Sequence, residues 1–314
     1  MLKTLATRIG LSAVLLVLVS FLVFLLIDLA PGDAAVSLAG DNASPERIQE
    51  VREQLGLDRA LPVRYVDWLA GAVHGNLGTS LSTGEPVSSV LLRTIPPTLS
   101  VVVVAVVIAV VVAMAGGTLA ALKPGSLFDR LMTILASLGV AVPGFWIALV
   151  LASEFAVQRH WLPAIGYTPL ADGFGPWLQH VILPSLALAA LVAAELMRQL
   201  RGTLQDALRS DYVLTARAKG LRANKLVFKH ALKNAAVPVI TVLGVRFATV
   251  LGGTVILEAI FNLQGIGQAM LQAVLARDIP TVLGVTVFVT VVVLLTNIAI
   301  EVLHPYFNPK VRKT

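Results

Sequence analysis

Cysteine is absent from the 314 residues of this sequence, and charged residues are scarce at 13%. Without a thiol the chain can form no disulfide, thiolate metal site or cysteine nucleophile. Soluble domains carry about 25% charged residues, so the composition lies outside the soluble class. Apolar runs such as "SVVVVAVVIAVVVAMAGG" do not alternate with polar residues and are long enough to cross a bilayer as helices. The sequence therefore predicts an all-α integral membrane protein.

Motifs of several enzyme classes are also missing. The sequence has no G-x-x-x-x-G-K-[ST] phosphate loop, no H-E-x-x-H and no G-x-S-x-G. We therefore expect no catalytic residues and no ATP hydrolysis by this chain itself. No metal site and no bound cofactor are expected, because the histidines are scattered without a pair at ligand spacing. They are His74, His160, His180, His230 and His304.

Six apolar stretches are candidate membrane spans. They cover residues 9–30, 97–122, 131–157, 180–198, 237–260 and 280–303. The first follows Lys3 and Arg8, as the apolar region of a secretory signal would. Its apolar run exceeds the roughly 7–15 residues of such a region, so we expect a retained membrane helix.

The cations divide unequally between the two sides of these spans. With six spans both termini share one side, and most cations fall there: Lys3, Arg8, Lys123, Arg130, the nine from Arg198 to Lys233, Lys310, Arg312 and Lys313. The short loops on the other side keep Arg159 and Arg277. The positive-inside rule therefore places both termini and the 123–130 and 199–236 segments in the cytoplasm. This distribution also accounts for the net charge of +6 without a nucleic-acid partner.

The sequence divides into three parts: residues 1–30 with the first span, an external segment at 31–96, and a membrane core at 97–314. In the external segment Ser44, Pro45 and Gly56 have the spacing of an N-cap, a first helical residue and a helix end. A second short helix is predicted over 62–73, followed by a turn-rich stretch "HGNLGTSLSTGEPV". We interpret this part as a small helical cap on the membrane domain.

Several charged residues lie within or near the spans: Asp28, Glu154, Glu195, Arg246, Glu258 and Glu301. Charge at the bilayer centre costs about 2.5–3.5 kcal/mol, so these groups should face protein, water or the interface. Most lie near a predicted span end, where an interfacial position is the simpler interpretation. Glu195 and Arg198 are spaced to pair on one helix. The candidates for the pathway or for intramembrane pairing are Arg246, Glu195, Arg198 and Glu258.

Arg246 differs from the others because it lies about nine residues inside the fifth span. It is expected either to line an aqueous pathway or to pair with a carboxylate. A chain of Asp, Glu and His residues that could relay protons is not evident, which counts against a proton-coupled carrier.

The segment "DYVLTARAKGLRANKLVFKHALKNAAVPV" (211–239) is basic although apolar spans flank it. A helix over 211–219 should end at Gly220, and Asn224 can cap a second helix that ends before Pro238. Such a basic helical knob could dock into a groove of a partner protein. The alternative is an amphipathic loop on anionic lipid headgroups.

The sequence "YVLTARAKGLRANKLVFKHALKNAAVPVIT" resembles the coupling loop of ABC-importer permeases of the oligopeptide and dipeptide family. The family motif is EAA, three residues, then Gly; Ala216 and Gly220 match it, whereas Leu214 and Thr215 replace the Glu and the first Ala. The resemblance implies that the loop contacts an ATP-binding subunit. The residues assigned to it are Tyr212, Thr215, Ala216, Arg217, Ala218, Lys219, Gly220, Leu221, His230 and Asn234.

Three further blocks resemble the same family in the same order. They are "GLDRALPVRYVDWLAGAVHGNLGTSLSTGEPV", "GGTVILEAIFNLQGIGQAMLQAVLARDIPTV" and "HPYFNPKVR". The first is similar to the external segment of the permease with the larger loop. In the second, Gln264 replaces a proline that the family often has. The resemblance thus covers nearly the whole chain.

The resemblance implies a permease subunit in a bacterial cytoplasmic (inner) membrane, paired with a second homologous permease as a heterodimer. Two partner subunits would bind ATP and Mg, and an external binding protein would deliver a peptide. Import of another cargo, such as a nickel chelate or haem, is the alternative within the family. A self-sufficient channel or secondary carrier is the alternative from another class.

Overall fold

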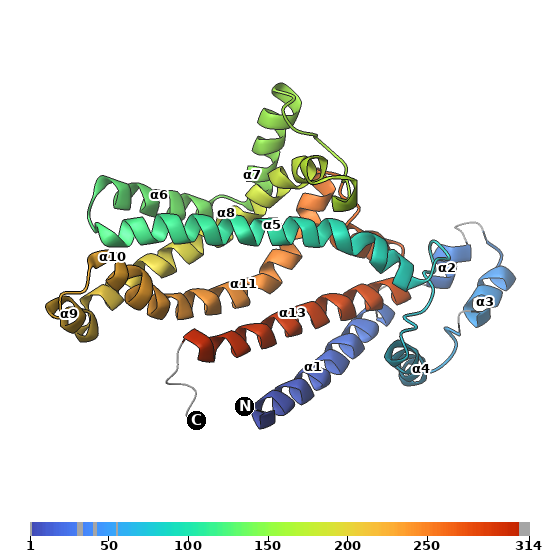
Figure 1. Cartoon of the computed structure of the whole chain (residues 1–314). Helices are drawn as coiled ribbons and strands as arrows, with labels where there is room; N and C mark the ends of the chain where they lie inside the picture. The colour runs from blue at the N-terminus through green and yellow to red at the C-terminus, as the bar shows by residue number, and fades with distance from the viewer. Residues whose placement is uncertain (1, 30–33, 40–42, 55, 308–314) are drawn as a thin grey trace. The chain divides into compact units, whose positions relative to one another are not determined.

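The computed structural model describes residues 2–29, 34–39, 43–54 and 56–307, and most of these residues are helical (Figure 1). Their only β-type pairing is an isolated bridge between Thr79 and Pro86. Five helices among them are long and apolar enough to cross a membrane, and a strongly bent helix pair would make a sixth. The prediction of an all-α membrane protein is confirmed. The chain forms two compact units, residues 1–96 with 264–294, and residues 97–263 with 295–314.

The first unit contains most of the predicted external helices. Its elements are α1 (Leu2–Asp28), α2 (Ala34–Ala39), α3 (Pro45–Gln54), α4 (Leu61–Val73), α12 (Ile266–Leu275) and the first parts of α5 (Val87–Leu122) and α13 (Ile279–Phe307). The predicted N-cap of α3 is confirmed, because the Arg47 N–H donates to Ser44 Oγ at 3.3 Å. Gly56, which follows that helix, has a positive φ of 61°.

Helix α4 packs on α1 through aromatic and polar contacts. Tyr65 is buried, and its ring lies edge-on to Phe24 at 5.7 Å between centroids. The Tyr65 hydroxyl also lies 2.8 Å from Ser20 Oγ of α1, within hydrogen-bond distance. Arg64 pairs with Asp28 at 2.7 Å. A helix beginning at Leu61, one residue before the predicted start, therefore packs directly on the first span.

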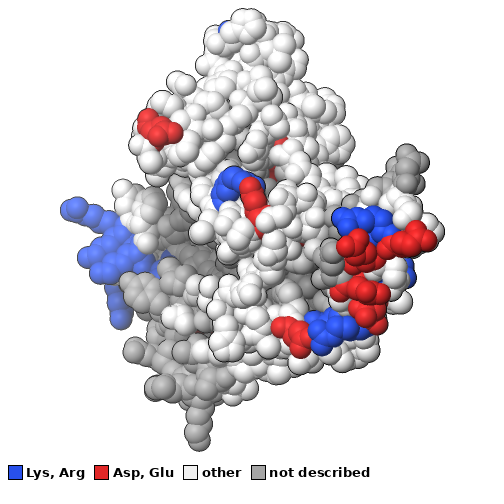
Figure 2. Space-filling model, turned by 90° about the vertical axis from the view of Figure 1, so that its right-hand side faces the viewer, with Lys and Arg blue, Asp and Glu red and all other residues white. Residues whose placement is uncertain are grey.

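On its outer surface this unit mixes the two signs of charge. Figure 2 shows one face of the molecule, where Lys and Arg atoms lie beside Asp and Glu atoms at several places and a separate group of Lys and Arg atoms lies on the left. Ion pairs in the same unit join Arg47 to Glu50 at 2.7 Å and Arg59 to Asp67 at 2.8 Å. Exposed pairs of this kind contribute little to stability, so they mainly keep the surface polar and balanced.

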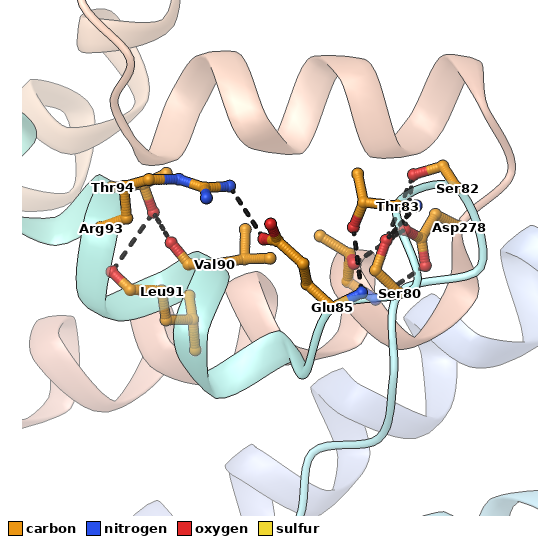
Figure 3. A network of polar contacts seen from close by, with 10 residues as sticks. Ser80, Ser82, Thr83, Glu85, Val90, Leu91, Arg93, Thr94 and Asp278 are labelled. Carbon is orange, nitrogen blue, oxygen red and sulfur yellow. Dashed lines mark hydrogen bonds and ion pairs between the residues drawn. The ribbon is translucent and has the colours of Figure 1, made fainter.

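A buried carboxylate joins the turn-rich stretch to the start of α13 (Figure 3). Asp278 is 1% exposed and accepts hydrogen bonds from the hydroxyls of Ser80, Ser82 and Thr281. Burial raises the pKa of Asp278, but these hydroxyl bonds and the Leu81 and Thr281 N–H groups outweigh it and hold the pKa below its usual value. Asp278 therefore caps α13 as an anion and fixes the stretch against it.

The second unit is built around one long helix, α8 (Phe174–Arg209), whose buried residues extend from Val181 to Leu204. The other elements are the remainder of α5, α6 (Leu127–Ala141), α7 (Gly144–Leu151), η1 (Ala152–Gln158), η2 (Leu170–Asp172), α9 (Asp211–Ala218), α10 (Ala223–Lys225), η3 (Leu226–Ala231) and α11 (Leu232–Ile260). Helices α6, α7 and α11 all pack on α8. The apolar core includes Val181, Leu183, Leu257 and Phe261.

The span predicted over 131–157 is a strongly bent pair of helices. Helix α6 ends at Ala141, and α7 with η1 leaves at an angle of 101°. Val142 is extended, with ψ of 126°, because a residue before proline is pushed out of the helical region. Pro143 then precedes the first residue of α7, a position that needs no helical N–H.

The prediction that the second helix of 211–239 ends before Pro238 is wrong. One helical segment runs from Ala223 to Ile260, and Pro238 lies inside it. A proline inside a helix costs about 3 kcal/mol. Ala235 and Val239 on either side of it are buried, and membrane helices tolerate proline where neighbouring elements satisfy the freed backbone groups. The N-cap position belongs to Arg222, so the predicted cap at Asn224 is wrong too.

Candidate functional site

The predicted helix end at Gly220 is confirmed. Helix α9 covers Asp211–Ala218, and Gly220 has φ of 78°, a conformation that residues with a Cβ rarely adopt. The Gly220 N–H donates to the Arg217 carbonyl at 2.9 Å, and the Leu221 N–H donates to the Ala216 carbonyl at 3.2 Å. These two bonds form a Schellman motif, which satisfies the last carbonyls of the helix. These two backbone hydrogen bonds and the positive φ of Gly220 therefore fix the turn after α9.

One side of α9 is anchored in the unit. Val213 is fully buried, and Leu226 and Ala231 of η3 are buried as well. Helix α9 contacts both α8 and η3, and in Figure 1 α9 and α10 lie together at the end of α8. At the junction with α11, the Asn234 amide donates to the Tyr212 hydroxyl at 3.0 Å. A force on α9 would therefore pass into α8 and α11.

The other side of this region is exposed, apolar and basic. Tyr212, Leu214 and Phe228 are 42%, 51% and 61% exposed. The same segment carries five exposed cations, namely Arg217, Lys219, Arg222, Lys225 and Lys229. Exposed apolar and cationic side chains on one segment suit a groove that has apolar walls and acidic edges. We call α9, the turn at Gly220, α10 and η3 the basic knob.

The structure brings the ten residues predicted for the loop into one region. Six are exposed on α9 and its turn: Tyr212, Thr215, Arg217, Ala218, Lys219 and Gly220. Ala216, Leu221 and His230 are half-buried, and Asn234 is exposed on α11. Prediction from sequence missed Phe228, although an aromatic residue among cations is a usable signal for a docking surface.

A second cluster of charge lines a pocket of about 490 Å³ between α8 and α11. Its lining residues are Glu195, Arg198, Gln199, Gly202, Thr203, Asp206, Val242 and Arg246. Arg246 Nε lies 2.5 Å from Glu195 Oε2, so the carboxylate partner expected for Arg246 is found. The pairing of Glu195 with Arg198 is absent from the described residues, because Arg246 reaches across from the neighbouring helix.

Glu258 does not line this pocket. Its side chain is 1% exposed and accepts a hydrogen bond from Thr98 Oγ1 at 2.6 Å. The interfacial position that its place near a span end suggested is therefore wrong for this residue. Glu154 is half-buried and pairs with Arg159 at 2.6 Å.

One buried pair was missed by sequence reasoning. Asp129 is buried and receives two bonds from the Arg201 guanidinium, one of them at 2.8 Å. It joins the start of α6 to α8. The two residues are 72 positions apart, so no local sequence pattern predicts their contact.

Comparison with known proteins identifies the family. Residues 113–313 match the family described as binding-protein-dependent transport system inner membrane component. Residues 1–102 match the corresponding N-terminal family of membrane components. Together the two matches take in both units of the structure.

Curated relatives align along nearly their whole length. A probable peptide ABC transporter permease of Sinorhizobium fredii is 38% identical over 94% of this chain and 94% of its own. A putative peptide transport system permease of Brucella abortus is 37% identical over 97% of both chains. The glutathione transport system permease GsiC of Escherichia coli is 38% identical over 95% of this chain and 94% of its own. The chain therefore belongs to the family of inner membrane components of binding-protein-dependent ABC transport systems.

Proposed function

We propose that this chain is a permease subunit of an ABC importer of peptides and that the basic knob is where an ATP-binding subunit docks. The observation that carries the proposal is the knob itself, a surface with exposed aromatic and cationic side chains at the end of the helix around which its unit is packed. The relatives named as peptide permeases support the choice of cargo.

The roles of this chain and of its partner subunits can be assigned from the motifs that the sequence contains and lacks. The sequence has no phosphate-binding loop, so we assign ATP, Mg and hydrolysis to the partner subunits. We assign to this chain half of the translocation pathway and one coupling surface. A second homologous permease completes the pathway, two ATP-binding subunits contact the pair, and an external binding protein delivers the peptide.

Coupling would work through contacts already described. Closure of an ATP-binding subunit on the knob displaces α9. Val213 of α9 is buried where that helix contacts α8, and the Tyr212 hydroxyl is hydrogen-bonded to Asn234 of α11. A displacement of α9 therefore moves the ends of α8 and α11. Those two helices carry Arg246 and Glu195, and we place them with Arg198 along the pathway. The knob and both termini lie in the cytoplasm on this proposal, because the cations concentrate there.

The proposal predicts that Ala216→Glu uncouples import from ATP hydrolysis while the chain still inserts. Ala216 is half-buried and its carbonyl closes the turn, so a larger, charged side chain disturbs the docking face. Gly220→Pro should act similarly, since proline cannot adopt φ of 78° and removes the N–H bonded to Arg217.

The test is purification from native membranes with mass spectrometry of the accompanying proteins, followed by uptake of labelled peptide. We expect ATP-binding subunits and a second permease with the wild-type chain and a loss of the ATP-binding subunits in Ala216→Glu. The matched control is Ala171→Glu, at an exposed alanine outside the knob. Undiminished peptide import by Ala216→Glu, with its ATP-binding subunits retained, would remove the coupling assignment.

A further inference from the structure

The pocket between α8 and α11 is lined by a single stripe of α8. Its six residues from that helix are Glu195, Arg198, Gln199, Gly202, Thr203 and Asp206, at spacings of three and four. This spacing puts them on one face of a helix. None is a large apolar residue, although more than half of the chain is hydrophobic. At about 490 Å³ the pocket is the size of a small-molecule site.

The charges of the lining balance, but only half of them are paired. Glu195 and Arg246 form an ion pair across the two helices. Arg198 and Asp206 line the same pocket, are exposed to solvent, and make no ion pair or hydrogen bond through their side chains with another described residue. One free cation and one free anion face a pocket whose net charge is zero. Such a lining favours a zwitterion over an anion or a cation, since either of these would leave one charge without a partner.

Gly202 leaves space in the wall of this pocket. A Cβ added there would meet no atom within 4 Å, and its backbone is that of an ordinary helix. Neither close packing nor a positive φ therefore requires glycine. Glycine inside a helix is unfavourable relative to alanine. A side chain at this position would project into the pocket, so the glycine keeps the pocket open.

The spacing of the unpaired charges sets the size of the ligand. Arg198 and Asp206 are eight residues apart on α8, which corresponds to about 12 Å along the axis at roughly 1.5 Å per residue. An extended peptide advances about 3.3–3.6 Å per residue, so three or four residues bridge that distance. The two ends of such a peptide carry an ammonium and a carboxylate.

We propose that this pocket is a transit site for short zwitterionic peptides, with the α-carboxylate toward Arg198 and the α-ammonium toward Asp206. The inference rests on the proposed function and adds that the permease itself recognises the two peptide ends. The ion pair of Glu195 and Arg246 holds α8 and α11 at the spacing that the pocket needs.

The test uses the membrane complex purified with its subunits but without the external binding protein. Equilibrium dialysis measures binding of labelled trialanine, N-acetyl-trialanine and trialanine amide. We expect each cap to weaken wild-type binding by about tenfold or more, since each removes a charge-assisted hydrogen bond. Arg198→Gln should bind the amide as well as the free acid, and Asp206→Asn should bind the acetylated peptide as well as the free amine.

Gly202→Leu provides an independent test because leucine suits a helix and fills the pocket. It should lose trialanine binding while the complex assembles normally. Gly252→Leu is the matched control, since Gly252 is a helical glycine of α11 with open space beside it and does not line the pocket. Arg130→Gln, at an exposed arginine outside the pocket, controls for loss of a cation.

Equal wild-type binding of free and capped peptides would overturn the site, as would full trialanine binding by Gly202→Leu. Displacement of trialanine by inorganic phosphate at equal concentration would also overturn it and indicate an anion site. Peptide import by vesicles containing the whole system is measured in parallel. Absence of import by the wild type rejects the proposed cargo, whereas import with no discrimination of peptide ends in the dialysis rejects only this site.

Discussion

At the scale of single residues, three buried carboxylates among the described residues each have at least one partner from a distant position in the sequence. Asp129 has Arg201, Glu258 has Thr98, and Asp278 has three hydroxyls. An unpaired buried charge costs far more than a paired one, so each partner is needed where its carboxylate is buried. Of these carboxylates, Glu258 was singled out from the sequence, whereas Asp129 and Asp278 were not. None of the partners was identified, because they are separated from the carboxylates by up to 198 positions.

Asp278 gives a prediction for stability and pH. Asp278→Asn should weaken the attachment of residues 79–86 to the start of α13 by about 1–3 kcal/mol, because it removes a charged acceptor from buried hydroxyls. In the wild type the pKa of Asp278 lies below its usual value. The stabilisation is thus complete above about pH 4 and is lost as the pH falls through the lowered pKa.

Hydrogen exchange with mass spectrometry of residues 79–86 measures this effect, with exchange times corrected for pH. The wild type should show faster corrected exchange near pH 3 than at pH 7, and Asp278→Asn should exchange fast at both. Asp58→Asn, at an exposed carboxylate of the same unit, should behave as the wild type. Equal protection in Asp278→Asn and wild type at pH 7 would show that the carboxylate does not hold this stretch.

At the scale of elements, small residues set how closely helices approach α8. A Cβ on Gly139 of α6 would lie 2.9 Å from the Ala194 Cβ and 3.1 Å from the Ala190 carbonyl oxygen. Neither atom belongs to a flexible side chain, so α6 could accept a larger residue only by moving away. Small residues at helix contacts are typical of membrane proteins, where close packing holds helices together.

Gly139→Ala should therefore destabilise the second unit by about 1–3 kcal/mol, the usual cost of overpacking. Tryptophan fluorescence during thermal unfolding in detergent measures the change. Gly252→Ala is the control, because that position has open space and alanine is the better helix former. An unfolding midpoint of Gly139→Ala at or above that of Gly252→Ala would contradict the close contact.

At the scale of the whole molecule, composition and periodicity predict the class and most helices, because both depend on local sequence. The cap of α3, helix α4 and the turn at Gly220 were predicted for the same reason. The break at Val142 and the continuation through Pro238 were not, since tertiary packing decides whether a proline bends a helix or stays within it. The charged pocket is lined by residues of both α8 and α11, so the sequence of either helix alone does not reveal its full lining.

The predicted orientation can be measured directly because the native chain has no cysteine. Single substitutions Ala60→Cys, Ala171→Cys and Ala223→Cys place one thiol each at exposed positions before α4, in η2 and at the start of α10. With the cations of residues 198–233 retained in the cytoplasm, a membrane-impermeant maleimide should label the first two in intact spheroplasts. Ala223→Cys should react only after permeabilisation. The reverse pattern would put the basic knob outside the cell, away from any ATP-binding subunit, and the coupling assignment would fail together with the orientation.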